Sequence, residues 1–199
     1  MNLTMSLQDA LDTVSRHLAP TGVRWLVGGS SGLILQRVAL SGGPRDLDLY
    51  VDEDDVAAAY EALRAYAVDA PCYSETAMYA SVLSHYEMAG TTVELVGAFR
   101  VAAGGSLYRV EAGYLWSRWA QELAQPEPAG GVGTVKLMPL AHELLFNLLR
   151  GRPDRYEPIA EAMRREPERH MAALADLLAR GRWSAALLAQ LVELGLAAR

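Results

Sequence analysis

The segments 23–30 (VRWLVGGS) and 45–49 (RDLDL) decide the fold of this chain. Residues 23–27 (VRWLV), which are mostly apolar, predict a buried strand, and residues 30–40 (SSGLILQRVAL) predict a helix that begins at the glycines. Glycine lets a ligand approach the backbone closely, and the unpaired N–H groups at a helix amino end favour an anion such as a phosphate. The first segment therefore predicts a strand, a tight turn and an anion site.

Two carboxylates lie on the next predicted strand. Side chains alternate along a strand, so Asp46 and Asp48 share one face while Leu47 and Leu49 share the other. Neighbours on one face are roughly 6.6 Å apart along the strand. The leucines suit a core, and the carboxylates suit one or two divalent cations. Mg²⁺ is favoured because it binds the oxygens of carboxylates and of a triphosphate, and without a cation the two charges would repel each other.

A third acid fits the same picture. Residues 79–88 and 91–98 predict a β-hairpin that turns at residues 89–90 and carries Glu94 among apolar neighbours. A carboxylate in such surroundings is rarely buried without a partner, so a shared metal site would explain Glu94. The alternative is that Glu94 faces solvent or pairs with an arginine.

This ordered set of residues resembles the signature of the DNA polymerase beta-type nucleotidyltransferase superfamily. More narrowly, it is similar to the small bacterial members, which include antibiotic nucleotidyltransferases and toxin- or antitoxin-type proteins. The resemblance covers roughly residues 23–100, as a strand, Gly-Gly-Ser, a helix, Asp-Leu-Asp-Leu and a later strand with Glu. It implies an α+β nucleotidyltransferase fold, in which a small mixed sheet is flanked by helices and followed by a C-terminal helical extension.

The resemblance also implies a reaction. A Mg²⁺-dependent enzyme of this type moves a nucleoside monophosphate from an NTP such as ATP to an acceptor hydroxyl and releases pyrophosphate. The implied catalytic and metal-binding residues are Asp46, Asp48 and Glu94, and the implied phosphate-binding residues are Gly28, Gly29 and Ser30.

One departure from the family pattern bears on activity. Residues 138–158 (MPLAHELLFNLLRGRPDRYEP) resemble a helix and Gly-Arg-Pro of several relatives, in which a lysine stands four residues before the glycine; here Asn147 stands there. The chain has a single lysine, Lys136, so phosphate neutralisation would fall to arginines. The candidates are Arg45, Arg150 and Arg152. For the last two we favour a role at the carboxyl end of a helix, where cations are stabilising.

Asn147 keeps a second function class open. A non-catalytic module with the same fold would bind or regulate a partner, as an antitoxin-like protein does. The presence of all three acids favours the enzyme, because a scaffold has no use for converging charges.

Composition limits the organisation of the chain. With 199 residues, 51% of them hydrophobic, it can form one domain or one domain with a helical extension. We expect a nucleotidyltransferase core over residues 1–133 and a mainly helical region over residues 134–199, separated at QPEPAGGVG (125–133). A net charge of -6 argues against a broad basic surface for extended nucleic acid.

The remaining patterns concern location and partners. Residues 1–18 predict an amphipathic helix and not a secretion signal, and no apolar stretch is long enough to span a membrane, so we expect a cytoplasmic protein without a membrane partner. The apolar residues 183–196 suit either the core or a homodimer surface. No motif in the sequence indicates the acceptor, the preferred NTP or the oligomeric state.

Overall fold

The structure, a computed structural model, describes residues 3–126 and 132–196. Its described strands form one mixed sheet in the order β3-β4-β5-β2-β1-β8-β7, with β6 paired to β5. The strands are β1 (Leu26–Gly28), β2 (Asp46–Val51), β3 (Cys72–Glu75), β4 (Tyr79–Met88), β5 (Thr91–Ala103), β6 (Ser106–Arg109), β7 (Gln121–Pro126) and β8 (Val132–Leu137). The α-helices are α1 (Met5–Leu18), α2 (Gly29–Leu35), α3 (Val56–Leu63), α4 (Ala112–Arg118), α5 (Leu140–Leu149), α6 (Pro153–Arg165), α7 (Pro167–Arg180) and α8 (Ala185–Glu193).

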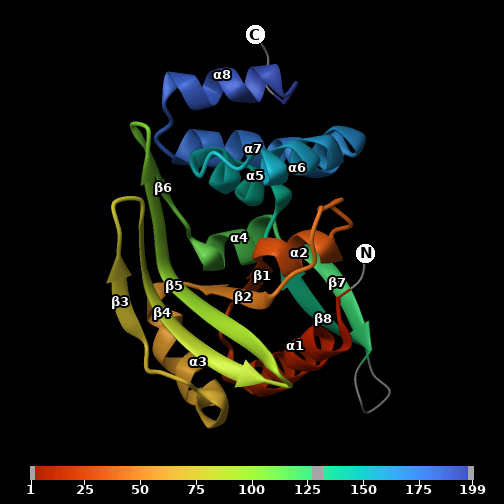
Figure 1. The fold of residues 1–199 in the computed structure, drawn as a ribbon, viewed down its shortest axis with the longest axis vertical. Coiled ribbons are helices and arrows are strands. Elements are labelled where there is room, and N and C mark those ends of the chain that lie inside the picture. Colours follow the sequence, from red (N-terminus) through yellow and green to blue (C-terminus); the bar gives the residue numbers. More distant parts are fainter. Residues whose placement is uncertain (1–2, 127–131, 197–199) are drawn as a thin grey trace.

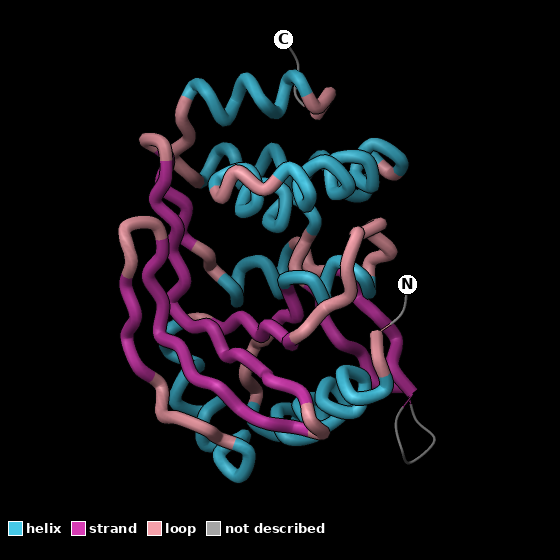
Figure 2. The backbone as a smooth tube through the Cα atoms, viewed as in Figure 1, coloured by secondary structure: helices cyan, strands magenta, loops and turns pink. Residues whose placement is uncertain are grey.

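Helices pack on both sides of the sheet. Helices α1 and α3 lie beneath it, while α5 to α8 form a stack at the opposite end of the molecule (Figure 1). Figure 2 shows the same layers, with the strands running between the two groups of helices. Each side has its own hydrophobic core, and α5, α6, α7 and α8 all contribute buried side chains to one of them.

The alternation predicted for the central strands is confirmed. Leu47 and Leu49 are fully buried in the core beneath the sheet, together with the apolar faces of α1 and α3. Asp46 and Asp48, which alternate with these leucines, therefore face the helical stack. On β5, Val93 and Leu95 are buried in the same lower core, so Glu94 also faces the stack.

Helix α5 is the central element of the helical stack. All ten of its residues are buried, including His142, Glu143 and Asn147. Pro139 stands at its N-cap, and Arg150 stands at its C-cap, as the sequence predicted for this arginine. A helix that is buried all round can aim polar side chains only into neighbouring elements or into a cavity.

The sequence predicted the type of most elements, but it misplaced the ends of some and missed several short strands. Strand β4 has the predicted bounds, and the hairpin turns at Ala89 and Gly90, whose φ angles are 52° and 73°. Helix α2 is shorter than predicted, because the chain leaves it before Arg37, whose φ is 62°. Strands β3, β6 and β7 were not predicted.

The predicted boundary between residues 133 and 134 falls inside β8. This strand pairs in parallel with β1, through Val27 and Leu137, and so belongs to the sheet; the first helix of the stack begins at Leu140. Residues 127–131 of the predicted linker lie outside the described residues. None of the helices that the structure describes has the length and apolar character needed to cross a bilayer.

His142 yields a prediction about pH. Its ring is fully buried, a hydrogen bond of 2.9 Å joins Nδ1 to the Tyr108 hydroxyl, and burial lowers the pKa of the imidazole from 6.5 to about 3. Between these values the unfolded chain binds a proton that the folded protein excludes, so stability falls as the pH drops below 6.5.

We expect His142→Phe to lose this dependence. The difference in unfolding free energy between the two proteins should change by about 1.4 kcal/mol per pH unit below about pH 6. Urea unfolding at several pH values from 7.5 downward would measure it. If the unfolding free energies of the two proteins differ by the same amount at every pH, the assignment of a neutral, buried imidazole is contradicted.

Candidate functional site

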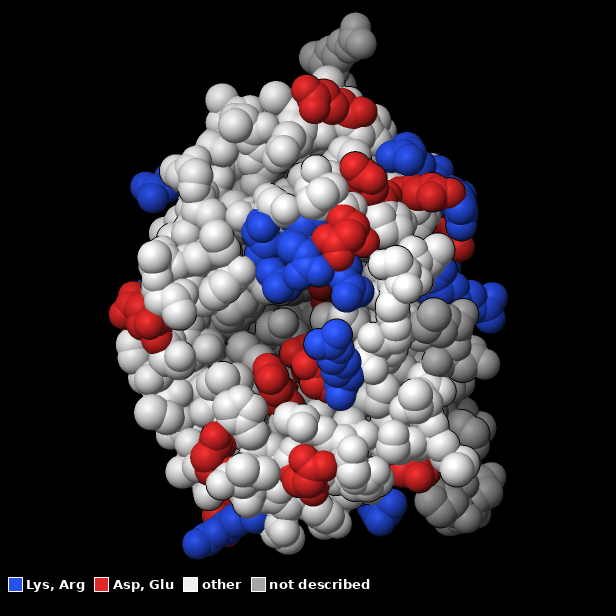
Figure 3. Space-filling view, viewed as in Figure 1, with Lys and Arg blue, Asp and Glu red and all other residues white. Residues whose placement is uncertain are grey.

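A cavity of about 430 Å³ lies between the upper face of the sheet and helices α5 and α6. Figure 3 shows it as a hollow in the middle of one face, with basic side chains above it, acidic side chains below it and a further basic side chain beside these acids. Strands β2 to β5 provide one wall, the segment from α5 to α6 provides the opposite wall, and the start of α2 closes one side.

The three predicted acids lie in this cavity. Strands β2 and β5 are parallel neighbours, and Asp48 stands in register with Glu94. Because paired strands are about 4.8 Å apart and register partners share a face, the carboxylates converge. Asp46, Asp48 and Glu94 all line the cavity. Glu94 is half-buried, so part of its side chain is open to solvent. Among the described residues it forms no ion pair, so the arginine-paired alternative finds no support.

Crowding and burial change the acidity of these groups. Burial, together with the charges of Asp46 and Glu94, raises the pKa of Asp48 to about 7, against a smaller opposing effect of Arg150. Burial and the charge of Asp46 also raise the pKa of Glu94. Carboxylates in this state gain from any cation that enters the cavity.

The glycine turn packs directly on these acids. Gly29 has φ 58°, and a Cβ there would lie 1.9 Å from Oδ2 of Asp48. Gly28 lies at the end of β1, where a Cβ would be 2.6 Å from the ring of Tyr50. Gly29 and Ser30 line the cavity, whereas Gly28 does not. Close packing therefore accounts for a glycine at position 28, and its contact with phosphate stays a prediction.

Sequence reasoning missed Glu143. This residue is fully buried on α5; its Oε1 accepts a hydrogen bond of 2.8 Å from the N–H of Gly29, and its Oε2 has no partner. Burial raises the pKa of this carboxyl to about 8, opposed by the Gly29 amide. The signal that singled out Glu94, an acid inside an apolar run, is equally present around Glu143.

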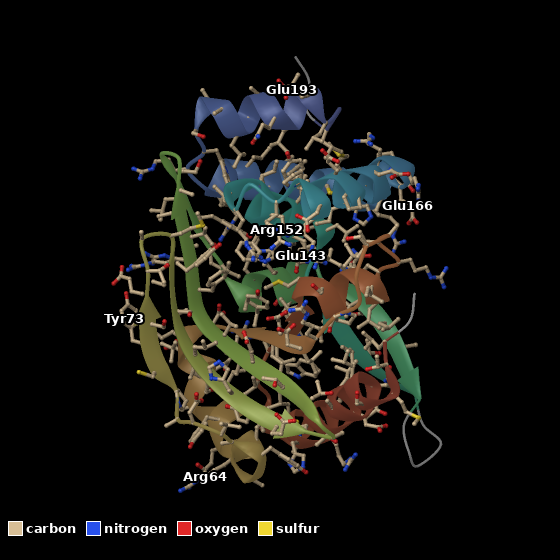
Figure 4. All side chains as sticks on the ribbon, viewed as in Figure 1. Arg64, Tyr73, Glu143, Arg152, Glu166 and Glu193 are labelled. Atoms are coloured by element: carbon tan, nitrogen blue, oxygen red, sulfur yellow. The ribbon has the colours of Figure 1, made fainter. Side chains whose placement is uncertain are left out.

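Arginines form the wall opposite the acids. Arg150 lies at the end of α5 as predicted, yet its side chain also lines the cavity, with the guanidinium 4.9 Å from the Phe146 ring centroid. Arg152 lines it too and pairs with Asp154 at 2.8 Å. Arg45 is exposed and is not among the lining residues. Figure 4 shows Arg152 and Glu143 near each other, between the sheet and the helical stack.

Two further side chains complete this wall. Arg155, which sequence reasoning also missed, lines the cavity, and its Nη1 is buried without a hydrogen-bond partner. Asn147 is buried, lines the cavity, and donates a hydrogen bond of 2.8 Å from Nδ2 to the backbone oxygen of Glu143. A neutral amide thus occupies the place of the family lysine.

The donors suit Mg²⁺ only in part. Within the described residues, no group of three or more His, Cys, Asp or Glu side chains is arranged to hold a metal ion. Mg²⁺ is usually bound through one or two carboxylates, with substrate phosphates and water supplying the other oxygens. Asp46 and Asp48, crowded and oxygen-bearing, match that requirement.

Comparison with known structures agrees with this architecture. TM1012 of Thermotoga maritima, provisionally classed as a nucleotidyltransferase, superposes with a TM-score of 0.60 over 82% of this chain and 96% of its own, at 19% identity. This chain has the nucleotidyltransferase fold. The predicted α+β class is thereby confirmed. At 19% identity the similarity shows the fold and not the reaction.

Two other solved structures are more distant. ANT(2'')-Ia in complex with adenylyl-2''-tobramycin has a TM-score of 0.48 at 12% identity, covering 88% of this chain and 99% of its own. The lincomycin-bound lincosamide antibiotic adenylyltransferase LnuA has a TM-score of 0.45 at 14% identity, covering 80% and 98%. No protein-family profile and no curated protein sequence matches the chain.

The contact between the glycine turn and Asp48 predicts the outcome of a paired substitution. Gly22 and Gly29 both have positive φ, but a Cβ at Gly22 would meet nothing within 4 Å. Gly22→Ala should cost about 1 kcal/mol for backbone strain. Gly29→Ala adds a clash with Asp48 and should cost about 3 kcal/mol. Urea unfolding of both variants measures the difference, and equal costs would show that the turn does not touch Asp48.

Proposed function

We propose that the protein is a nucleotidyltransferase that moves a nucleoside monophosphate from an NTP to an acceptor hydroxyl. The observation that carries the proposal is the meeting of Asp46, Asp48 and Glu94 in one cavity, beside a glycine turn and opposite arginines. Acids on one wall and guanidinium groups on the other suit a substrate that is anionic and arrives with a cation.

Asp46 and Asp48 are the residues that would hold Mg²⁺. When bound, Mg²⁺ neutralises charge on the α-phosphate and on the leaving pyrophosphate. The aspartates fix this position because β2 is held in the middle of the sheet, with its other face buried. Rigid placement matters because positioning and electrostatics supply most of the rate in phosphoryl-type transfer.

Glu94 is the residue placed to take a proton. It stands in register with Asp48 on the neighbouring strand, and its raised pKa makes it a better base than an exposed carboxylate. In the proposed step the acceptor oxygen bonds to the α-phosphorus, the bond to the β-phosphate oxygen breaks, and the hydroxyl proton passes to Glu94. The products are the nucleotidylated acceptor and pyrophosphate.

The other residues would bind the phosphates. Arg150 and Arg152 line the cavity and provide positive charge in the absence of the family lysine. Ser30 lines it at the start of α2 and offers a backbone N–H and a hydroxyl. Arg45 is exposed and is the weaker candidate.

Two observations favour a second candidate function, a binding or regulatory module without turnover. Asn147 is neutral where the resembling proteins have a lysine, so the cavity has one cation fewer than theirs. Glu143 places an additional carboxyl group beside the glycine turn. Both changes weaken the attraction for a triphosphate. Such a protein would keep the fold and work through a partner.

Product analysis separates these functions without knowledge of the acceptor. The protein is incubated with each NTP, Mg²⁺ and glycerol, so that water and glycerol serve as simple hydroxyl acceptors. We expect NMP, glyceryl-NMP and pyrophosphate, and we expect Asp48→Asn to reduce the rate about 100-fold or more, because one preorganised charge at the reacting phosphate is removed.

Asp54→Asn is the matched control, since Asp54 is exposed and outside the cavity. It should leave the rate unchanged. Thermal stabilisation by Mg²⁺ and NTP without any cleavage would favour the binding module. Cleavage to NDP and phosphate, or equal rates for the two variants, would contradict the proposed transfer.

A further inference from the structure

Glu143 occupies the position where the glycine turn would meet a phosphate. The N–H of Gly29 points to Oε1 of Glu143 at 2.8 Å, although the two residues are 114 positions apart in the sequence. We propose that Glu143 is an internal occupant of the polyphosphate subsite, and that it sets the affinity for triphosphate by competing for the Gly29 amide. This inference rests on the proposed function and identifies Glu143 as the residue that limits how tightly the triphosphate substrate binds.

The geometry shows that the contact is specific. Glu143 is fully buried, and its Oε1 also lies close to Gly28, where a Cβ would come within 3.0 Å of it. A carboxyl oxygen accepts the amide hydrogen whether or not the group carries a proton, so the competition does not depend on its charge. A triphosphate oxygen needs the same donor.

The second oxygen of Glu143 indicates where the side chain goes when the amide is taken. Oε2 is buried and has no hydrogen-bond partner, and on the same wall of the cavity Nη1 of Arg155 is buried and also without one. Unpaired buried groups of opposite character are costly, and pairing them recovers that cost. In the proposed competition, a polyphosphate that takes the Gly29 amide would turn Glu143 toward Arg155, whose Nε lies 3.6 Å from Oδ2 of Asp154 while Nη1 is left for Glu143.

Asn147 is consistent with this arrangement. It lies one helical turn after Glu143 on α5 and donates a hydrogen bond to the Glu143 backbone oxygen. A lysine at that place would be spaced to pair with Glu143 and would draw its carboxylate away from the turn. With a neutral amide there, the contact with Gly29 has no such competitor.

Binding of inorganic tripolyphosphate tests the proposal directly. Its dissociation constant, measured by calorimetry in the presence of Mg²⁺, is compared for the wild type, Glu143→Ala and Glu143→Gln. Glu143→Ala frees the amide and should bind about tenfold more tightly, the value of one hydrogen bond to a charged group. Glu143→Gln keeps an oxygen acceptor and should stay within about threefold of the wild type.

Glu193→Ala controls for the loss of one negative charge, since Glu193 is exposed on α8, far from the cavity (Figure 4). It should bind as the wild type does. Unchanged or weaker binding by Glu143→Ala overturns the proposal. Equal tightening in Glu143→Gln also overturns it, because charge and not occupancy of the amide would then be responsible.

A measurement on the wild type guards against a variant that does not fold. In a ¹⁵N-resolved NMR titration with tripolyphosphate and Mg²⁺, the Gly29 amide signal should shift as its acceptor changes from carboxyl to phosphate. Saturable binding that leaves this signal in place overturns the proposal.

These results also separate this inference from the proposed function. Tighter tripolyphosphate binding by Glu143→Ala without nucleotidyl transfer would overturn the enzyme assignment alone. Transfer by a wild type whose tripolyphosphate affinity is insensitive to Glu143→Ala would overturn only the role of Glu143.

Discussion

Repulsion among carboxylates on two paired strands is the constraint on which the site depends. Asp46 and Asp48 on β2 and Glu94 on β5 face one partly buried cavity, where burial and mutual repulsion raise the pKa of Asp48 to about 7. An isolated pair of strands could not hold such groups together. They stay in place because the alternate residues of the same strands are apolar and buried on the other face of the sheet. The energy of that core offsets the cost of crowding the acids.

The opposite wall of the cavity carries positive charge, which partly balances these acids. Helix α5 is buried along its whole length, and its end brings Arg150 to the cavity, followed by Arg152 and Arg155 at the start of α6. The arginines attract anions toward the acids, while the acids attract a cation. A metal-bound triphosphate satisfies both walls at once, whereas a bare anion or a bare cation satisfies only one. The arrangement thus favours a composite ligand.

The sequence predicts those parts of the fold and site that depend on local patterns. Alternation along β2 places Asp46 and Asp48 opposite the leucines, and the turn at residues 89–90 sets the hairpin that carries Glu94. Both features can be predicted from residues that lie within a few positions of one another in the sequence. Strand β3 escapes prediction because its four residues are all exposed and carry no apolar alternation.

The contacts across the cavity were beyond such local reasoning. Glu143 reaches Gly29 only because α5 packs against the turn between β1 and α2, a tertiary contact between distant parts of the chain. Arg150 was placed correctly at the carboxyl end of a helix, whereas Arg152 stands at the N-cap of the next helix, α6. That both side chains reach the cavity follows from the packing of α5 and α6 and not from the sequence pattern. Arg155 was missed for the same reason.

The ionisation of Asp48 tests the central claim most directly. A ¹³C-detected NMR titration of its side-chain carboxyl, in the absence of divalent cations, should give a pKa of about 7, because burial and the neighbouring acids oppose its charge. A pKa near the ordinary aspartate value of about 4 would mean that the acids are neither crowded nor buried as described, and would contradict the account.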